Sequence, residues 1–166
     1  FNRATTGRYP PGSTLKPFIG LAGLEAGVVD ETSREFCPGW FQLEGRERKY
    51  RCWHRRGHGL LDLVDAIAQS CDVFFYSLAM RLGVDPIHDY LKRFGFGAKT
   101  NIGIGQESAG LLPSSQWKQA ALGKPWYPGE TVITGIGQRY NEATALQLAK
   151  ATAVLALRGQ MVQPKI

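Results

Sequence analysis

Two residues near the start of the chain, Ser13 and Lys16, have the types and the spacing of a nucleophile and its base. Pro17 cannot lie deep inside a helix, because it lacks a backbone N–H and its ring clashes with the preceding turn. We therefore expect a helix to begin close to Ser13, so that the Ser13 hydroxyl and the Lys16 amine share one helical face. A serine needs a neighbouring base to take its proton, and a lysine kept neutral by burial can be that base. The helix N-terminus favours a developing alkoxide.

The same residues also have a simpler interpretation, in which Ser13 is an N-cap and Lys16 lies on the surface of the helix. A second motif, Ser70-Cys71-Asp72, favours the catalytic interpretation. Ser-x-Asp at a helix–helix corner is usually a cap. Its functional interpretation is that Ser70 relays a proton between Lys16 and a leaving amine, while Asp72 orients the lysine or the substrate amide.

The elements that position these motifs are predicted to be mainly helical. Residues 30–59 lack a steady period, and we expect a long ordered loop that something must hold in place. Residues 124–129 have the composition of a turn. Short extended pieces are expected at 100–105 and 161–163. The caps and apolar spacing predict helices over about 13–25, 60–68 (cap Asp62), 73–82, 85–95 (cap Asp85), 114–121 (cap Ser114) and 144–158 (capping box Thr144-x-x-Gln147).

Length and composition describe a globular chain with a real core. The 166 residues are 43% hydrophobic and carry a net charge of +6. No apolar run is long enough to span a membrane, and the N-terminus does not resemble a signal peptide. Much of the positive charge lies between Arg46 and Arg56, with no nucleic-acid-binding signature beside it. We expect a solvated basic loop that faces an anionic polymer or a membrane surface, and no nucleic-acid partner.

Four stretches together resemble one family, the penicillin-binding, active-site-serine transpeptidases, whose first two signatures are Ser-x-x-Lys and Ser-x-Asn. The resemblance is greatest to the class B, cell-elongation (penicillin-binding protein 2) type. The stretches are residues 4–17 (ATTGRYPPGSTLKP), 70–76 (SCDVFFY), 124–129 (KPWYPG) and 135–138 (GIGQ).

The resemblance implies a peptidoglycan D,D-transpeptidase that needs no cofactor for catalysis. Ser13 would attack the carbonyl between the two terminal D-alanines of a stem peptide, Lys16 would be the general base, and Ser70 would shuttle the proton. An amine of a neighbouring stem would then accept the acyl group, and β-lactams would acylate Ser13. The resemblance also places Gly135 and Gln138 at the substrate.

The chain departs from the family pattern at several positions. Asp72 stands where the family signature has asparagine, as it often does in the elongation type. Arg139 stands where we expect glycine, and Ala145 where proline is frequent. The third family signature, Lys-Thr-Gly, does not occur, and it would supply an oxyanion-hole donor whose loss alone costs about 10²–10³ in rate.

The fold class implied is the helical part of the α+β (three-layer) penicillin-binding and β-lactamase-like fold, mainly α in residues 1–166, with most of the central sheet missing. We expect a fragment of a single domain that is inactive or impaired by itself. The resemblance further implies an inner-membrane protein facing the periplasm, with its anchor outside this chain. Its implied partners are stem peptides, β-lactams, a SEDS-family glycosyltransferase and elongation-complex scaffold proteins.

Three cysteines and a histidine form a candidate metal site: Cys37, Cys52, His58 and Cys71. An odd number of cysteines cannot all pair within the chain, and free thiols are a liability in an oxidising compartment. A structural zinc with four protein ligands would protect them and hold residues 30–59 against the second motif. A Cys37–Cys52 disulfide with a buried Cys71, or three unlinked thiols, are the alternatives.

The chain has two other histidines, and its motifs are compatible with other functions. His54 competes with His58, which is favoured because its glycine neighbours permit a tight turn, and His88 is expected on the surface. Within enzymes, the alternative is a serine β-lactamase or a penicillin-sensing domain. From another class, the chain could be a zinc-stapled, non-catalytic interaction module that uses the basic loop.

Overall fold

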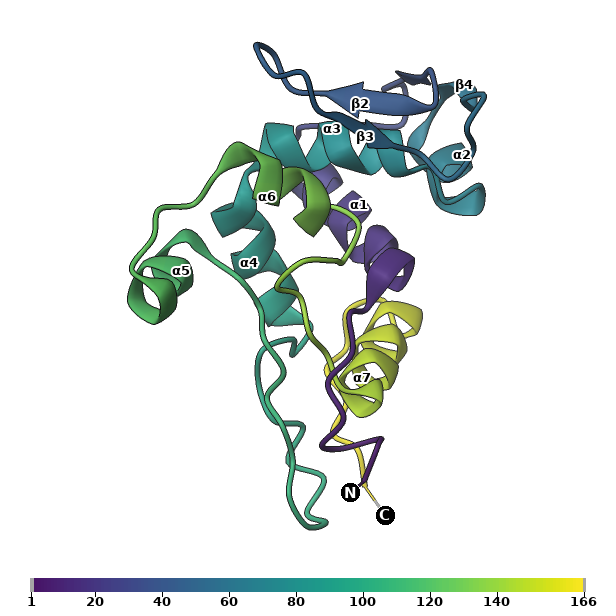
Figure 1. Ribbon diagram of the computed structural model, residues 1–166. Coiled ribbons are helices and arrows are strands. Elements are labelled where there is room, and N and C mark those ends of the chain that lie inside the picture. The colour runs from purple at the N-terminus through teal and green to yellow at the C-terminus, as the bar shows by residue number, and fades with distance from the viewer. Residues whose placement is uncertain (1, 166) are drawn as a thin grey trace.

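The computed structural model describes residues 2–165 and is mainly helical, as predicted (Figure 1). A short 3₁₀ turn, η1, precedes the first helix, and four three-residue strands lie between the first and second helices. In chain order the elements are η1 (Gly12–Leu15), α1 (Lys16–Glu25), β1 (Glu35–Cys37), β2 (Trp40–Gln42), β3 (Lys49–Arg51), β4 (Gly59–Leu61), α2 (Leu63–Ala68), α3 (Asp72–Leu82), α4 (Val84–Arg93), α5 (Ser115–Leu122), α6 (Pro128–Thr134) and α7 (Ala145–Ala156).

Helix α3 is the centre of the molecule and packs against α1, α2, α4 and α6 as well as β1, β2 and β3. A helix that is apolar nearly all round must be buried on all sides. The sequence of α3 meets this requirement. Its buried side chains are Val73, Phe74, Phe75, Tyr76, Leu78 and Ala79.

Helix α1 begins where Pro17 requires, with the proline in its first turn. Phe18 fixes the helix against the end of α4, because its ring meets Phe94 and Phe96 edge-on at centroid distances of 5.0 and 5.5 Å. Such pairs add to the free energy gained by burial. The prediction of a helix from about Ser13 is confirmed, with its first turn wound as a 3₁₀ helix rather than an α-helix.

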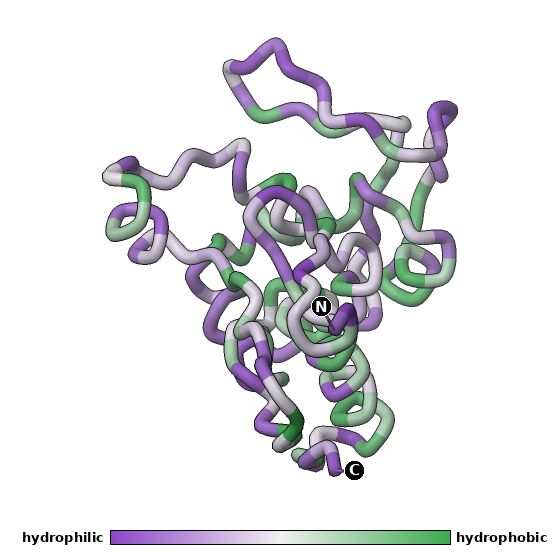
Figure 2. The backbone as a smooth tube through the Cα atoms, turned by 60° about the horizontal axis from the view of Figure 1, so that its bottom comes forward, coloured by the Kyte–Doolittle hydropathy of each residue, from purple (hydrophilic) through white to green (hydrophobic). Residues whose placement is uncertain are grey.

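The segment 30–59 is more regular than the predicted loop. β1 pairs with β4 and β2 pairs with β3, both antiparallel, so the segment folds as two small ribbons. In Figure 1 the β2–β3 ribbon lies over α3, and the loop between its strands projects beyond the helices. That loop is largely hydrophilic in Figure 2, whereas green apolar segments concentrate in the helices. Strands of three residues are too short for periodicity to indicate them.

Two further expectations are wrong for a common reason. Residues 100–105 and 161–163 form no strand. Between Thr100 and Ile102 the backbone N–H groups donate to the carboxylate of Glu107, not to a neighbouring strand. Gln163 in turn donates through its side-chain amide to the Thr100 carbonyl at 2.8 Å. Side chains therefore satisfy the backbone groups that a sheet would have used.

Helix ends follow the predicted caps in most places. Asp62, Ser114 and Thr144 each accept a backbone N–H in the first turn of the helix that follows. Asp85 does not cap α4, because its carboxylate instead accepts from both the N–H and the hydroxyl of Ser115 at the start of α5. The residue before α4 is Gly83.

Helix α6 begins at Pro128-Gly129, where the sequence predicts only a turn. Proline is favoured at the first position of a helix, where its missing N–H has no intrahelical acceptor. Glu130 closes the start of the helix, since its side chain accepts from the Tyr127 N–H at 3.0 Å. Among residues 2–165, no helix has the length and hydrophobicity that a membrane span requires.

Candidate active site and metal centre

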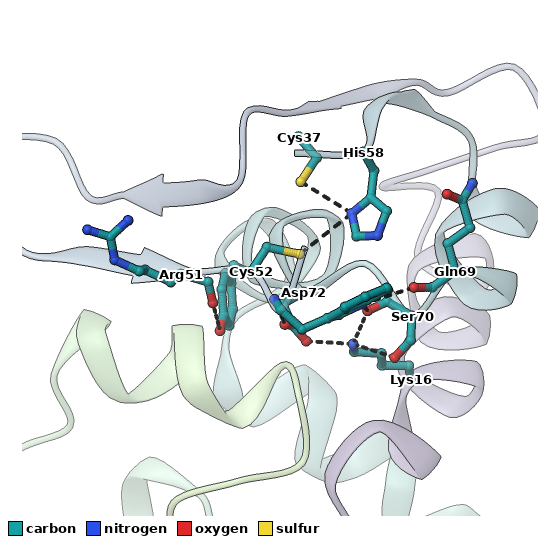
Figure 3. A network of polar contacts seen from close by, with 10 residues as sticks. Lys16, Cys37, Arg51, Cys52, His58, Gln69, Ser70 and Asp72 are labelled. Atoms are coloured by element: carbon teal, nitrogen blue, oxygen red, sulfur yellow. Dashed lines mark hydrogen bonds and ion pairs between the residues drawn. The ribbon is translucent and has the colours of Figure 1, made fainter. Parts of the chain in front are cut away.

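Lys16 is the first residue of α1 and is only 1% exposed. Its Nζ lies 2.7 Å from Asp72 Oδ1, 3.0 Å from Ser70 Oγ and 2.9 Å from the Ser70 carbonyl oxygen (Figure 3). These three acceptors match the three donors of an ammonium group. The structure therefore brings the base of the first predicted motif into direct contact with both polar members of the second.

Ser70 lies at the corner between α2 and α3 in an unusual backbone conformation. Its φ is +52°, in the left-handed region that non-glycine residues seldom occupy. The Ser70 N–H donates to the Ile67 carbonyl at 3.1 Å and the Cys71 N–H to the Ala66 carbonyl at 2.9 Å, which closes the end of α2. This turn directs both the hydroxyl and the carbonyl of Ser70 at Lys16. Non-glycine left-handed residues are frequent at functional sites.

Asp72 is the first residue of α3, where the helix dipole favours a negative charge. Its two oxygens have different partners. Oδ1 accepts from Lys16, and Oδ2 accepts from the backbone N–H of Trp53 at 3.0 Å. The sequence predicts that Asp72 orients the lysine or the substrate amide, and the structure places its Oδ1 against the lysine. The sequence does not predict the contact with Trp53, whose one signal is its place directly after a candidate metal ligand.

Ser13 lies in the η1 turn with its side chain exposed. It is not an N-cap: Pro11 precedes the turn, and no side chain caps it. In the described residues, the hydrogen bonds of Lys16 Nζ go to Ser70 and Asp72 rather than to Ser13. The serine hydroxyl is thus presented to solvent one turn before the buried amine.

The 135–138 stretch packs against the turn that carries Ser13. The Gly12 N–H donates to the Gly137 carbonyl at 2.9 Å, and a Cβ on Gly137 would lie 2.3 Å from the Gly12 carbonyl oxygen. Gly135 is buried, and a Cβ there would lie 2.5 Å from the Phe75 carbonyl oxygen, so this glycine allows α6 to pack against α3. Gln138, the other residue placed at the substrate by resemblance, is exposed.

The four candidate metal ligands converge on one point, and their ligand atoms all lie within 4.8 Å of one another. Cys37 Sγ and Cys52 Sγ are 3.5 and 3.6 Å from His58 Nδ1, as Figure 3 shows. Tetrahedral zinc, with bonds of about 2.3 Å to sulfur and about 2.0 Å to nitrogen, would hold each sulfur about 3.5 Å from the nitrogen. The donor set and its spacing therefore fit a structural zinc ion.

Burial shifts the pKa values of two members of this cluster, His58 and Cys71. Burial lowers the pKa of His58, assisted by the nearby His54, so its imidazole is held in the neutral form that binds metals. Burial raises the pKa of the Cys71 thiol far above its usual range. All three cysteines are free and buried, so the structure does not contain the Cys37–Cys52 disulfide that was the alternative to a metal site. Buried thiols this close to an imidazole need a cation to become thiolates.

The choice between the two imidazoles is resolved by distance. His58 belongs to the cluster and His54 does not, although their rings are only 5.0 Å apart. His88, expected on the surface, is half-buried, and its Nδ1 lies 3.2 Å from the Pro113 carbonyl oxygen.

An exposed serine in a turn, a buried lysine and a Ser-x-Asp corner on a mainly helical scaffold are typical of the class of active-site-serine acyltransferases. The whole chain, residues 1–166, matches the family model described as the penicillin-binding protein transpeptidase domain. The chain therefore belongs to this family, which confirms the resemblance.

Similar proteins of known name extend over the full chain. It is 42% identical to the peptidoglycan D,D-transpeptidase MrdA of Escherichia coli K12 over 165 residues, 99% of this chain and 26% of that protein. It is 43% identical to MrdA of Acinetobacter baumannii over 166 residues, 100% of this chain and 25% of that protein. The chain thus spans about a quarter of the length of these relatives.

Solved structures give the same result. Penicillin-binding protein 2 of Pseudomonas aeruginosa, in complex with WCK 5153, is 50% identical, with a TM-score of 0.97 over 99% of this chain and 38% of that one. Penicillin-binding protein 2 of Helicobacter pylori, in complex with MreC, is 33% identical, with a TM-score of 0.94 over 99% of this chain and 31% of that one.

Proposed function

We propose that the full-length protein is a peptidoglycan D,D-transpeptidase of the cell-elongation type, and that this chain supplies its nucleophile and base. The observation that carries the proposal is the buried Lys16 amine, which touches Ser70 Oγ at 3.0 Å and lies one turn after the exposed Ser13. The names of relatives that are 42–43% identical over the whole chain support this activity over a β-lactamase, a penicillin-sensing domain or a non-catalytic module.

In the acylation step, Ser13 Oγ attacks the carbonyl carbon between the two terminal D-alanines of a stem peptide. To act as the base, Lys16 must first lose to solvent one proton of the ammonium that pairs with Asp72; the Ser13 proton then passes to the Lys16 amine, and a C–O bond forms. When the tetrahedral intermediate collapses, the C–N bond breaks. Ser70 Oγ then passes a proton to the leaving amine and takes one from Lys16, so that free D-alanine departs. The contact between Lys16 Nζ and Ser70 Oγ supports this use of a lysine base and a hydroxyl relay.

In the transfer step, the amine of a neighbouring stem attacks the acyl-enzyme carbonyl. Its proton returns to Ser13 through the same groups as the ester C–O bond breaks and the new amide forms. Asp72 orients the Lys16 amine throughout, because its Oδ1 is held 2.7 Å from Nζ. A β-lactam would enter the first step in place of the stem peptide and remain on Ser13.

The chain itself would be the helical part of the transpeptidase domain. A Lys-Thr-Gly segment, which the sequence lacks, and the strands of a central sheet, which residues 2–165 do not form, would complete the oxyanion hole, so we infer that this piece alone is inactive or severely impaired. We also propose that the whole protein lies in the bacterial inner membrane with this domain in the periplasm. Its partners would include a SEDS-family glycosyltransferase and elongation-complex scaffold proteins. Solved complexes of relatives with MreC and in a peptidoglycan synthase complex support such partners.

Labelling with a fluorescent penicillin tests the function. The full-length protein should form one covalent adduct, and peptide mapping should locate it at Ser13. Ser13→Ala should abolish labelling, whereas Ser33→Ala, a serine in the loop after α1, should label like wild type. Labelling that survives Ser13→Ala, or wild-type protein that does not label, would refute the proposal.

We further propose that Cys37, Cys52, His58 and Cys71 hold a structural zinc ion, as the donor set and distances support. The ion would have four protein ligands and no position for water, and would stabilise the cluster's thiolates. Cys71 lies between Ser70 and Asp72, so the cluster would hold the catalytic corner in place. Elemental analysis of the full-length protein should find about one zinc per chain, and Cys37→Ser should lower both this content and the melting temperature. Wild-type protein without zinc would refute the metal assignment.

A further inference from the structure

The residue after the metal-ligand candidate Cys52 connects the cysteine cluster to the catalytic corner. Trp53 donates its backbone N–H to Asp72 Oδ2 at 3.0 Å. Its indole Nε1 donates to the Ser70 carbonyl at 3.0 Å and to the Gln69 carbonyl at 3.1 Å. Thus both N–H groups of one residue bind the two residues that hold Lys16.

These contacts use acceptors that Lys16 also uses. The Ser70 carbonyl accepts from Lys16 Nζ on one side and from the Trp53 indole on the other, and Asp72 gives one oxygen to each residue. Ser70 is in the left-handed conformation, which costs conformational energy and needs support from its surroundings. The indole N–H supplies such support at the carbonyl of the residue whose hydroxyl is the proposed proton relay.

The indole ring has little part in the core. Trp53 is 61% exposed, and its ring meets His54 and His58 edge-on at centroid distances of 5.5 and 5.3 Å. Most of its surface is therefore not available for hydrophobic stabilisation, whereas its two polar groups are fully engaged. An exposed ring with both N–H groups hydrogen-bonded is unusual for a tryptophan whose only role is hydrophobic packing.

We propose that Trp53 is a positioning residue for acylation: it holds Ser70 and Asp72 so that Lys16 and Ser70 Oγ are aligned toward Ser13, and it transmits the order of the cysteine–histidine cluster to that corner. The proposal rests on the proposed function, because it concerns the same reaction. Trp53 itself would not contact the substrate. Replacing Trp53 should therefore change the rate constant of acylation and not the dissociation constant of the acyl donor.

The test compares Trp53→Phe with Trp126→Phe in the full-length protein. Trp53→Phe keeps an aromatic ring and the backbone N–H but removes the indole donor. Trp126→Phe is the matched control, since it removes an indole N–H that donates to Thr131 Oγ1 at 2.8 Å elsewhere in the chain. Stopped-flow acylation by a fluorescent penicillin separates the noncovalent dissociation constant from the first-order acylation rate constant. Zinc content and melting temperature are measured on the same samples.

Trp53→Phe should lower the acylation rate constant about threefold to tenfold, the size expected for one hydrogen bond, with the dissociation constant, zinc content and melting temperature unchanged. Trp126→Phe should acylate like wild type. A wild-type rate constant in Trp53→Phe would overturn the inference while leaving the proposed function intact. So would a change confined to the dissociation constant, which would make Trp53 a wall of the substrate site, or a rate loss accompanied by loss of zinc or of the fold. If wild-type protein were not acylated at Ser13, the proposed function would fail first.

Discussion

Lys16 and Asp72 form an ion pair with 2.7 Å between Nζ and Oδ1, in which the lysine side chain is only 2% exposed. The pair joins the first residue of α1 to the first residue of α3, so it fixes the relative position of the two helices that carry the catalytic motifs. Removing one partner from a buried pair leaves an uncompensated charge and is strongly destabilising. Asp72 is therefore expected to contribute to the stability of the fold as well as to the proposed positioning of Lys16.

Asp72→Asn should be harmful here, although asparagine stands at this position in the family signature. Asp72 uses both oxygens as acceptors, for Lys16 Nζ and for the Trp53 N–H. The asparagine amide has one acceptor oxygen, so its NH₂ group would have to face an N–H donor. We expect the acylation rate constant to fall about tenfold, measured with a fluorescent penicillin, because one charge-assisted hydrogen bond is lost.

A matched control for this change is Asp62→Asn at the start of α2. Asp62 accepts the Asp65 N–H at 2.8 Å as an N-cap, and asparagine caps a helix equally well. Asp62→Asn should therefore leave acylation and the melting temperature unchanged. If Asp72→Asn also acylated like wild type, the two-oxygen account of Asp72 would be wrong.

Gly137 is expected to control the position of the nucleophile. It has a φ of +66°, and a Cβ would lie 2.3 Å from the Gly12 carbonyl oxygen, so Gly137→Ala must displace the turn that carries Ser13. Gly27 has the same φ, but a Cβ there would meet no atom within 4 Å. Both alanine variants should lose about 1 kcal/mol to backbone strain. Only Gly137→Ala should also slow acylation, by at least about tenfold. Equal acylation by the two variants would show that this contact does not position Ser13.

The two neighbouring histidines give a sharp test of the metal site. His58→Ala removes a ligand and should reduce the zinc content well below about one per chain, with a lower melting temperature. His54→Ala removes a ring only 5.0 Å away that lies outside the cluster, and should retain the metal. Elemental analysis of both purified variants decides between them. Retention of zinc by His58→Ala, or its loss from His54→Ala, would show that His58 is not the fourth ligand.

The candidate residues of this site could be selected from the sequence, because they form local motifs. Ser13 and Lys16 lie within one turn, and Ser70 and Asp72 flank one corner between two helices with clear caps. Caps and apolar spacing also predicted α1, α2, α3, α5 and α7 close to their observed bounds. Local signals of this kind depend on neighbours in the chain, which a sequence displays directly.

Long-range geometry explains what could not be predicted. Of the short strands in segment 30–59, β1 and β4 exist because they pair with each other across about twenty residues, and not because of their own periodicity. The left-handed φ of Ser70 follows from the close of α2, and serine does not indicate it. The role of Trp53 depends on contacts with Gln69, Ser70 and Asp72 that no local pattern encodes. The preference for His58 over His54 was confirmed by proximity to the cysteines.

Glu130 should give the fold a characteristic sensitivity to acid. Burial alone would raise its pKa, but hydrogen bonds from Lys118, from the Tyr127 N–H and from Tyr140 outweigh burial and hold the pKa below its usual 4.5. Because the folded state then binds the proton less readily than the unfolded state, this stabilisation is fully present above about pH 4.5. It is lost as the pH falls through the lower, folded pKa.

Glu130→Gln should remove that part of the acid sensitivity and destabilise the protein at pH 7. Lys118 is buried and would lose its counter-charge, at a cost of about 3 kcal/mol. The melting temperature should therefore fall at pH 7, and it should change less than that of wild type when the pH is lowered from 7 to about 3, through the pKa of Glu130 in the folded state. The exposed Glu31→Gln is the control and should behave like wild type at both pH values. If Glu130→Gln and wild type lost stability in parallel on acidification, the acid sensitivity would have to arise from other carboxylates.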